Sequence, residues 1–408
     1  YSKKGVLQFG PAGLGTLWQG FLPDCQDESG DPVVLYDQAA DRWLLSQFTT
    51  AGPEYYNCVA LSTSGDPLGS YYLYAFSTGP NFPDYPKYGV WSDGYYITTR
   101  EFAPDGSFAG DGVYAEDRDQ MLVGNPTPLQ VKFILTPTPA YLPGDGLLPA
   151  DIDGPTPPPA GSPEYLLGSM DNGGPYGAPF DGLNEFEMKV DWTLPSASTF
   201  ALNAEIPIAP YDTIYPCLPT DARQCIPQPA ATERVDILSY RQRPLWRLAY
   251  RNFGDHESLV TNQSVEARKR QAGIRWWEIR NPADPVLYQE GTYAPDDGVH
   301  RWMGSVAMDK LGDLAVGFSV SNGKTVFPGI RYAGRLATDP LGQLSRGEAV
   351  LFDGSGSQLG VNRWGDYTAM SVDPSNGCTF WYVNEYYQRS ALSHWQTRIG
   401  SFKFSGCS

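Results

Sequence analysis

A short pattern recurs along this chain and restricts the folds that it can adopt. HRWMGSVAMD at 300–309 and NRWGDYTAMSVD at 362–373 both place Arg-Trp before a glycine, a small apolar strand and an aspartate. Looser copies are PKYGVWSDGYYITT at 86–99 and YRNFGDHESLV at 250–260, and each copy is followed by a second, more aromatic strand. DPVVLYD and DRWLLSQF, within 31–48, have the same strand–turn–strand form. A chain that repeats one such unit is expected to fold as an array of similar small sheets.

The spacing of these repeats matches the blades of a β-propeller. They begin near residues 31, 86, 250, 300 and 362. Neighbouring starts lie roughly 50 to 60 residues apart, the length of one four-stranded antiparallel sheet with its loops. Composition favours short strands, because Gly 44 and Pro 36 leave few stretches for a helix and aromatic residues are 13%. We therefore predict an all-β chain, folded as a single β-propeller domain over 1–408.

The stretch between residues 100 and 250 shows no clear repeat, and we expect it to hold two further blades. LQVKFILTP at 129–137 and FEMKVDWTL at 186–194 are its strand-like segments. A proline-rich segment around 138–165 lies between them. Because the repeats resume beyond it, we interpret this segment as a surface insertion rather than a linker between domains.

The N-terminal residues bear on the number of blades. Residues 1–20 are expected to give about two strands, which complete the last blade unless their partner strand precedes Tyr1. The prediction is about seven four-stranded blades, with six as the alternative. A ring closed by both termini would leave no open sheet edge.

Long strings of this sequence resemble a family of secreted bacterial β-propeller-type proteins, most of them uncharacterised. The strings that carry the resemblance are DPVVLYDQAADRWLLSQF, FPDYPKYGVWSDGYYITT, LAYRNFGDHESLV, RWMGSVAMD, RWGDYTAMSVDPSNGCTFWYVNEYY and TRIGSFKF. Together they span nearly the whole chain. The resemblance implies the propeller fold and export from the cell, and it implies no particular activity.

The cysteines predict an exported protein stapled by disulfides. There are six, none in a C-x-x-C pair, and only three histidines, so a structural zinc site is not expected. We predict the pairs Cys25–Cys58, Cys217–Cys225 and Cys378–Cys407. The last pair would tie the C-terminus to the final repeat. The chain starts at Tyr1 without a signal peptide or long apolar span, so we expect a processed or truncated product outside the membrane.

Charge restricts the possible partners. The formal net charge is −17 and charged residues make up 18% of the chain. Nucleic-acid binders usually carry a basic stripe, and none is visible here. The basic run at 268–270 is expected to be a solvated hairpin tip. We therefore expect no nucleic-acid partner.

The cationic and aromatic residues of the repeats form the candidate binding site. The first strand of each blade lines the channel of a propeller, so equivalent repeat positions are expected to converge on one rim. The candidates are Lys87, Tyr88, Arg251, Asp255, His256, Glu257, Arg301, Trp302, Arg363, Trp364, Asp366 and Tyr367. Arginine can clamp a carboxylate through two hydrogen bonds, and tryptophan can stack on a sugar face. The alternative is structural, with each arginine paired to a neighbouring carboxylate and each tryptophan packed between sheets.

Few residues are candidates for catalysis or metal binding. Glycoside hydrolysis needs two carboxylates at a set separation, for which Asp366 and Glu257 are the candidates. No serine lies in a G-x-S-x-G elbow, and only 371–381 loosely resembles the sialidase hairpin. Calcium is the one cofactor considered, because acidic turns can supply its oxygen ligands, although none here has EF-hand spacing. Its candidate ligands are Asp151, Asp153, Asp296 and Asp297.

Three functions fit these observations. We expect an extracellular, non-catalytic module for adhesion, matrix formation or surface-filament assembly, with glycans or copies of itself as partners. If the N-terminal blade lacks a strand, a neighbouring copy would supply it by strand addition. The alternatives are carbohydrate binding at the channel rim, or a glycosidase-like or lyase-like activity there.

Overall fold

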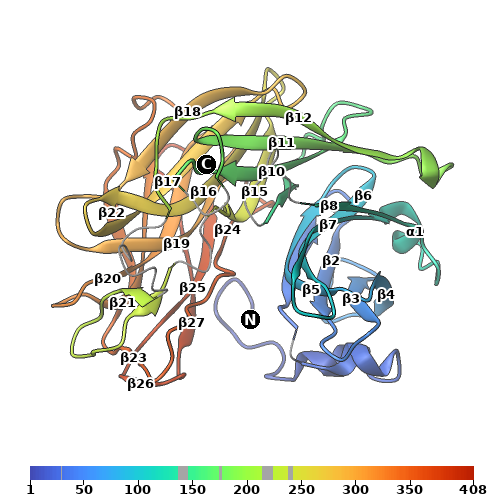
Figure 1. The fold of residues 1–408 in the computed structure, drawn as a ribbon, viewed down its shortest axis with the longest axis horizontal. Coiled ribbons are helices and arrows are strands. Elements are labelled where there is room, and N and C mark those ends of the chain that lie inside the picture. Colours follow the sequence, from blue (N-terminus) through green and yellow to red (C-terminus); the bar gives the residue numbers. More distant parts are fainter. Residues whose placement is uncertain (29, 137–145, 174–176, 214–223, 238–241) are drawn as a thin grey trace. The chain divides into compact units, whose positions relative to one another are not determined.

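The computed structural model describes residues 1–408 except 29, 137–145, 174–176, 214–223 and 238–241 (Figure 1). Strands make up 50% of the chain and helices 4%, which confirms the all-β prediction. No helix of the described part is long and apolar enough to cross a membrane. The chain forms two compact units, residues 1–136 with 190–199 and residues 137–189 with 200–408, and each is described by itself.

The first unit contains two antiparallel four-stranded meanders, which start close to the predicted repeats at 31 and 86. The first meander comprises β1 (Val33–Asp37), β2 (Arg42–Phe48), β3 (Tyr55–Ser62) and β4 (Tyr71–Gly79). The second comprises β5 (Phe82–Val90), β6 (Gly94–Phe102), β7 (Phe108–Asp117) and β8 (Gln130–Leu135), with the short helix α1 (Arg118–Leu122) between β7 and β8. Because the first meander already has four strands, the premise for strand addition at the N-terminus does not hold.

Residues 1–20 form no strand, so the prediction that they complete a blade is wrong. They contain the 3-10 helix η1 (Leu14–Trp18), and η2 (Pro23–Gln26) follows. Gly and Pro recur in this segment, and both disfavour a strand ladder. Trp18 is fully buried in a cluster with Cys25 and Cys58, so the segment covers part of the first meander instead.

The second unit contains four further meanders of three or four strands. The first comprises β9 (Leu148–Asp153), β10 (Glu164–Met170), β11 (Gly182–Lys189) and β12 (Thr199–Pro207); η3 (Pro195–Ala197), which precedes β12 in the sequence, belongs to the first unit. The next comprises β15 (Leu245–Asn252), β16 (Glu257–Arg268), β17 (Gln271–Arg280) and β18 (Val286–Tyr293). The last two are β19 (His300–Met308), β20 (Leu314–Ser321), β21 (Phe327–Arg335) and β22 (Glu348–Gly354), then β24 (Ala369–Val372), β25 (Phe380–Tyr386) and β27 (Gln396–Phe402). Two-stranded pairings join β13 (Gln224–Ile226) to β14 (Val235–Asp236) and β23 (Gln358–Leu359) to β26 (Ala391–Leu392).

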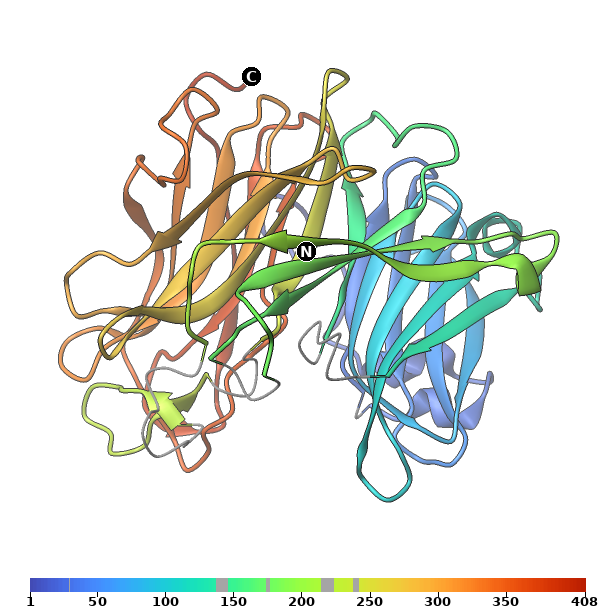
Figure 2. The same ribbon diagram turned by 45° about the horizontal axis from the view of Figure 1, so that its top comes forward.

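Two of these meanders are fused through their first strands. β9 and β15 pair in parallel, from Ala150 opposite Leu248 to Asp153 opposite Arg251. The result is an eight-stranded sheet that runs from β12 to β18 (Figure 2, green to yellow). The carboxyl ends of β9 and β15 therefore lie side by side.

The region between residues 100 and 250 differs from the prediction. Its described residues form one complete meander, β9–β12, where two blades were expected. The segment 129–137 holds β8, the last strand of the preceding sheet, and 186–194 holds the end of β11. The segment 138–165 is not simply an insertion, because it contains β9; its first part, to residue 145, lies outside the described residues. The described chain thus shows six meanders.

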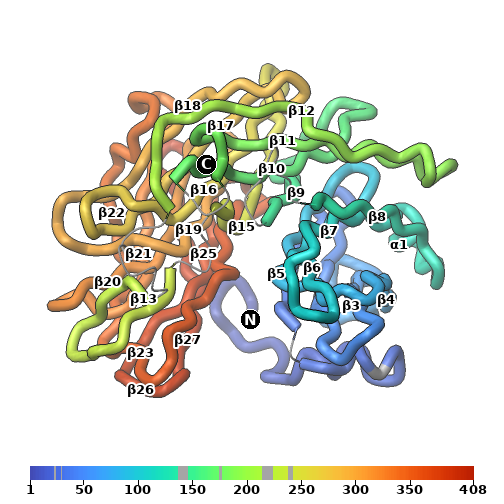
Figure 3. Tube along the Cα trace, viewed as in Figure 1, coloured from blue at the N-terminus to red at the C-terminus, as the bar shows by residue number. Residues whose placement is uncertain are grey.

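The strand patterns explain where the core of the second unit lies. All nine residues of β19 and all eight of β20 are buried, as expected for strands covered on both faces. The middle strand of the last sheet, β25, alternates between buried and partly exposed positions. The red trace in Figure 3 follows β24, β25 and β27 as neighbouring strands of the last sheet.

Two predicted disulfides are confirmed. Cys25–Cys58 joins η2 to β3, and Cys378–Cys407 ties the segment after β27 to the turn before β25. Cys225 is disulfide-bonded, but its predicted partner Cys217 lies outside the described residues. The prediction for 268–270 is also confirmed, because β16 ends at Arg268 and β17 begins at Gln271.

Candidate functional site

The predicted rim residues do not converge on one rim. Arg301 is the second residue of β19, whereas the Arg251 Nε donates a hydrogen bond to the carbonyl oxygen of Met308, the last residue of β19, at 3.1 Å. A strand of this length spans roughly 20 Å or more, so the two arginines lie near its opposite ends. The repeat motif lies near the end of β15 but near the start of β19. Alignment of the repeats therefore placed Arg251 and Arg301 at equivalent positions, which they do not occupy in the structure. Lys87 belongs to the first unit, buried in β5 with its Nζ 3.4 Å from the centre of the Tyr85 ring.

Arg301 is a structural residue. Its side chain is 1% exposed and pairs with Asp297 at 2.8 Å and with Glu348 at 2.6 Å. A further hydrogen bond runs from Nη1 to the carbonyl oxygen of Val299 at 2.7 Å. This guanidinium has no free edge for a ligand, so the structural alternative holds for Arg301.

Trp302 and Trp364 are structural as well. Their ring centroids are 5.5 Å apart, and the Trp364 Nε1 donates to the Ser319 Oγ at 3.0 Å. They are 0% and 2% exposed, so neither can stack on a sugar. Arg363, in contrast, is exposed in the loop that leads into β24.

The loop around Gly365 brings Glu385 close to Asp366. The Gly365 N–H donates to the Glu385 Oε1 at 2.8 Å. Burial and the negative charge of Asp366 raise the pKa of Glu385 to about 7, although the Gly365 hydrogen bond opposes the shift. Sequence reasoning named Asp366 and Tyr367 and missed Glu385. The sequence feature that could have indicated Glu385 is that it is the single carboxylate in FWYVNEY, a strand of mostly apolar and aromatic residues.

The turn between β15 and β16 holds the other predicted candidates. The His256 Nδ1 lies 2.7 Å from the Asp255 Oδ1, and the His256 ring stacks on Phe253 with centroids 4.8 Å apart. The Glu257 Oε1 accepts a hydrogen bond from the Tyr250 hydroxyl. This pairing occupies one oxygen of Glu257 but leaves the turn partly exposed to solvent.

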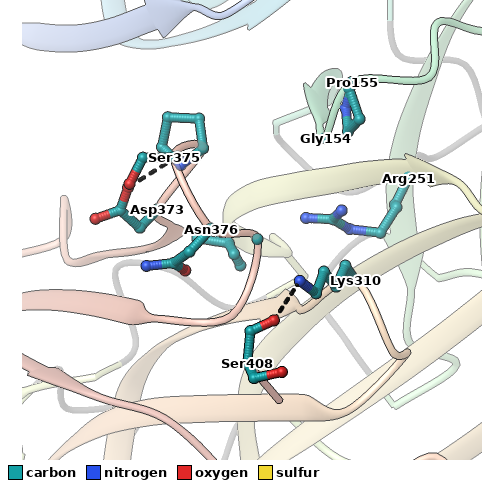
Figure 4. A pocket seen from close by; sticks show the side chains of 11 residues that line it. Gly154, Pro155, Arg251, Lys310, Asp373, Ser375, Asn376 and Ser408 are labelled. Atoms are coloured by element: carbon teal, nitrogen blue, oxygen red, sulfur yellow. Dashed lines mark hydrogen bonds between the residues drawn. The ribbon is translucent and has the colours of Figure 1, made fainter.

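A pocket of about 490 Å³ lies where β9, β15, β19 and β24 end (Figure 4). These are the first strands of the four meanders of the second unit, and each contributes its last residues or the turn that follows. The lining residues are Gly154, Pro155, Arg251, Lys310, Val372, Asp373, Pro374, Ser375, Asn376, Gly377 and Ser408. Of the sequence candidates, the pocket includes Arg251.

One wall of the pocket is a loop held by its own side chains. The Asp373 Oδ1 accepts hydrogen bonds from the backbone N–H of Ser375 at 3.0 Å and from its hydroxyl at 2.7 Å. The Asn376 Oδ1 accepts the N–H groups of Cys378 and Thr379 at 2.8 and 2.9 Å. Because Cys378 is also in a disulfide, this wall is pre-organised.

The facing wall carries positive charge. Arg251 is 5% exposed, and its guanidinium points into the space between Lys310 and Gly154 in Figure 4. Gly154 has φ +84, and a Cβ there would lie 2.5 Å from the Arg251 Nη1, so glycine is what allows this approach. The Lys310 Nζ donates to the backbone oxygen of Ser408 at 2.7 Å.

The candidate calcium ligands have other partners. The Arg247 side chain, 5% exposed, forms ion pairs with both Asp151 at 2.8 Å and Asp153 at 2.7 Å. Asp297 pairs with Arg301, and Asp296 is exposed. Within the described residues, no three His, Cys, Asp or Glu side chains are grouped so that they could hold a metal ion.

No protein-family model and no curated protein matches the chain. Solved structures do match, at low identity. An α-L-arabinofuranosidase from Fusarium graminearum, solved with an iminosugar inhibitor, is 11% identical and has a TM-score of 0.45 over 93% of this chain and 94% of its own. An α-L-arabinanase from Penicillium chrysogenum, solved with arabinobiose, is 10% identical with a TM-score of 0.44 over 92% and 94%. A protein of unknown function from Dyadobacter fermentans is 10% identical with a TM-score of 0.41 over 81% and 80%.

These matches correct the functional prediction. The solved structures that cover most of the chain include glycoside hydrolases, which contradicts the expected non-catalytic module for adhesion, matrix formation or filament assembly. Identities of 10 and 11% with TM-scores below 0.5 transfer no substrate and no reaction to this chain.

Proposed function

We propose that this chain is an extracellular β-propeller that recognises carbohydrate in the pocket at the ends of β9, β15, β19 and β24. The observation that carries the proposal is the lining of this pocket. Two proline rings, Pro155 and Pro374, offer apolar surface for the C–H faces of a sugar. Hydroxyl, amide and charged groups between them offer partners for its hydroxyls.

The size and rigidity of the pocket support this function. Its volume of about 490 Å³ falls within the range of small-ligand sites. The wall at 373–377 is fixed by hydrogen bonds and by the disulfide at Cys378, so little order would be lost on binding. Disulfides are typical of exported proteins, which supports a role outside the cell.

Blocking the pocket tests the proposal. Ser375→Trp would fill the space from an exposed loop position, and Ser64→Trp is its control. Ser64 is also exposed and also makes a side-chain hydrogen bond in a tight turn, but it lies in the first unit. Titration calorimetry with neutral and acidic oligosaccharides should show binding to the wild type and to Ser64→Trp, and loss in Ser375→Trp. Equal binding by all three proteins would refute the pocket as the site.

Hydrolysis is a second candidate, and Glu385 is the observation that favours it. A carboxyl group with a pKa of about 7 beside a second carboxylate is the arrangement used for general-acid catalysis of glycoside cleavage. If the chain cleaves glycosides, Glu385→Gln and Asp366→Asn should each lower the release of reducing ends by about a hundredfold or more. Reducing-end release that neither substitution changes would exclude this pair.

A further inference from the structure

Arg251 is a buried cation that makes no direct ion pair within the described part of the chain. Its polar contacts among the described residues are the Nε hydrogen bond to the Met308 carbonyl and a distant approach to the Phe253 ring, 6.0 Å from the centroid. No carboxylate of the described chain lies within ion-pair distance of it. Arg301, which is equally buried, has two carboxylate partners.

The acidic groups nearest Arg251 are committed to other partners. Asp153 is bound by Arg247 at 2.7 Å, and the Asp309 Oδ1 accepts the backbone N–H groups of Leu311 and Asp313 at 2.8 and 3.1 Å. Burial lowers the pKa of Arg251, and the charge of Arg247 adds to this, whereas Asp153 and Asp309 oppose it. These two carboxylates therefore act on Arg251 from a distance, without a direct contact.

The geometry around Arg251 fixes which atoms remain for a ligand. The Arg251 Nε faces the Met308 carbonyl, and Gly154 has no side chain to cover the Arg251 Nη1. The two terminal nitrogens of Arg251 are therefore left at the pocket surface. Lys310 lines the same side of the pocket and is exposed, so it places a second positive charge beside the guanidinium. A guanidinium held in a fixed orientation is suited to a planar oxyanion, which it can bind through two parallel hydrogen bonds.

We propose that the pocket takes an acidic sugar, and that Arg251 binds the carboxylate of a uronic acid residue there with Lys310 as the second cation. A carboxylate in this place would give the buried guanidinium the direct ion-pair partner that it lacks among the described residues. The remaining hydroxyls of the sugar would face the loop 373–377 on the opposite wall. This inference rests on the proposed function, since it names the class of carbohydrate that the same pocket takes.

Paired probes test the charge requirement on the intact chain. The probes are trimers of galacturonic, glucuronic, mannuronic and guluronic acid, the neutral methyl ester of each, and sulfated trimers of sugars that carry no carboxylate. Calorimetry with the wild type should show at least one uronate trimer binding tenfold or more tightly than its methyl ester. This comparison needs no substitution, so it does not depend on whether a variant folds.

Variants then assign the effect to residues. Arg251→Met should lower the affinity for the uronate to that of the ester, and Lys310→Met should lower it by a smaller factor. Arg268→Met is the matched control, because Arg268 also donates from Nε to a backbone carbonyl, that of Ala294 at 2.9 Å, but is exposed at a hairpin tip. It should bind as the wild type does.

The outcomes separate the two proposals. Equal binding of acids and esters, unchanged by Arg251→Met, would overturn the acidic-sugar inference and leave carbohydrate recognition standing. Preference for the sulfated trimers over the uronates would overturn the assignment of a carboxylate. Binding of no trimer in any form would overturn the acidic-sugar inference together with the proposed function.

Discussion

Two buried arginines with the same local motif have different roles, and the difference lies in their counter-charges. Arg301 meets Asp297 and Glu348, whereas Arg251 meets a carbonyl oxygen and a pocket. A buried guanidinium without a direct ion-pair partner is tolerated where solvent or a ligand reaches it. Charge pairing is thus the property that distinguishes a structural arginine from a candidate binding residue.

Removal of Arg301 should be strongly destabilising. Arg301→Met would leave the buried side of Glu348 without one of its partners, and we expect a loss of about 3 kcal/mol in the free energy of unfolding. Urea denaturation with fluorescence detection would measure this loss. Arg346→Met is the control, because Arg346 pairs with Asp339 while exposed, and it should change stability little. Similar effects of both substitutions would contradict a structural role specific to Arg301.

Glu385 should make stability depend on pH between about 4.5 and 7. Its pKa rises from 4.5 to about 7 in the folded chain, so the folded state binds a proton that the unfolded state has already lost in that window. Stability therefore falls as pH rises through the window, on the order of 3 kcal/mol from this group. Glu385→Gln should remove that part of the slope in denaturation series at several pH values. An unchanged slope in the variant would show that the carboxyl titrates normally.

At residue scale, the sequence could identify candidate residue types but not their partners. Asp151 and Asp153 are acidic turn residues in the sequence, and only folding places Arg247 against both. Glu385 was missed in the sequence for the same reason, because its neighbours Gly365 and Asp366 come from another part of the chain. Pairing across long sequence separations is not encoded in any local pattern.

At the scale of elements, the repeats located most of the first strands. The starts predicted near 31, 86, 250 and 300 fall at or near β1, β5, β15 and β19. β9 was missed because LPADID lacks the alternation of a half-buried strand and carries two aspartates. Those aspartates are tolerated there because both form ion pairs with Arg247.

The Cys378–Cys407 disulfide should stabilise both the last sheet and the pocket wall. It closes a loop with a sequence separation of 29, for which chain-entropy estimates give about 3 to 4 kcal/mol. The Cys378→Ala, Cys407→Ala double variant should lose stability by about this amount in urea denaturation. It should also bind oligosaccharide more weakly, because the 373–377 loop would be less ordered. Full affinity in the destabilised variant would contradict a role for the disulfide in the pocket.

The tip of the β16–β17 hairpin should tolerate, and gain from, a glycine. Arg270 has φ +61, a left-handed conformation that costs most residues other than glycine. Arg270→Gly should raise the free energy of unfolding by up to about 1 kcal/mol, which thermal denaturation would detect. Lys269→Gly, at the neighbouring tip residue without a positive φ, is the comparison and should not stabilise. Destabilisation by Arg270→Gly would mean that the side chain has a role in the turn.

At the scale of the whole molecule, the net charge of −17 opposes the approach of an acidic ligand. If the pocket takes uronates, long-range repulsion should slow association at low ionic strength. Stopped-flow rates for a uronate trimer should therefore rise about twofold or more between 10 and 150 mM salt, while rates for its methyl ester stay constant. A uronate rate that falls with salt would show that the local field of Arg251 and Lys310 dominates the encounter.

The parallel pairing of β9 with β15 also has a consequence for the dynamics of the second unit. It joins residues almost a hundred positions apart, Ala150 to Leu248 and Asp153 to Arg251, and buries the shared ladder between two meanders. Neither meander can open along this ladder without exposing backbone groups of the other. Amide hydrogens of β9 and β15 should therefore exchange with deuterium together and slowly, as one cooperative unit. The strand that carries Arg251, β15, would then be among the last parts of the chain to open.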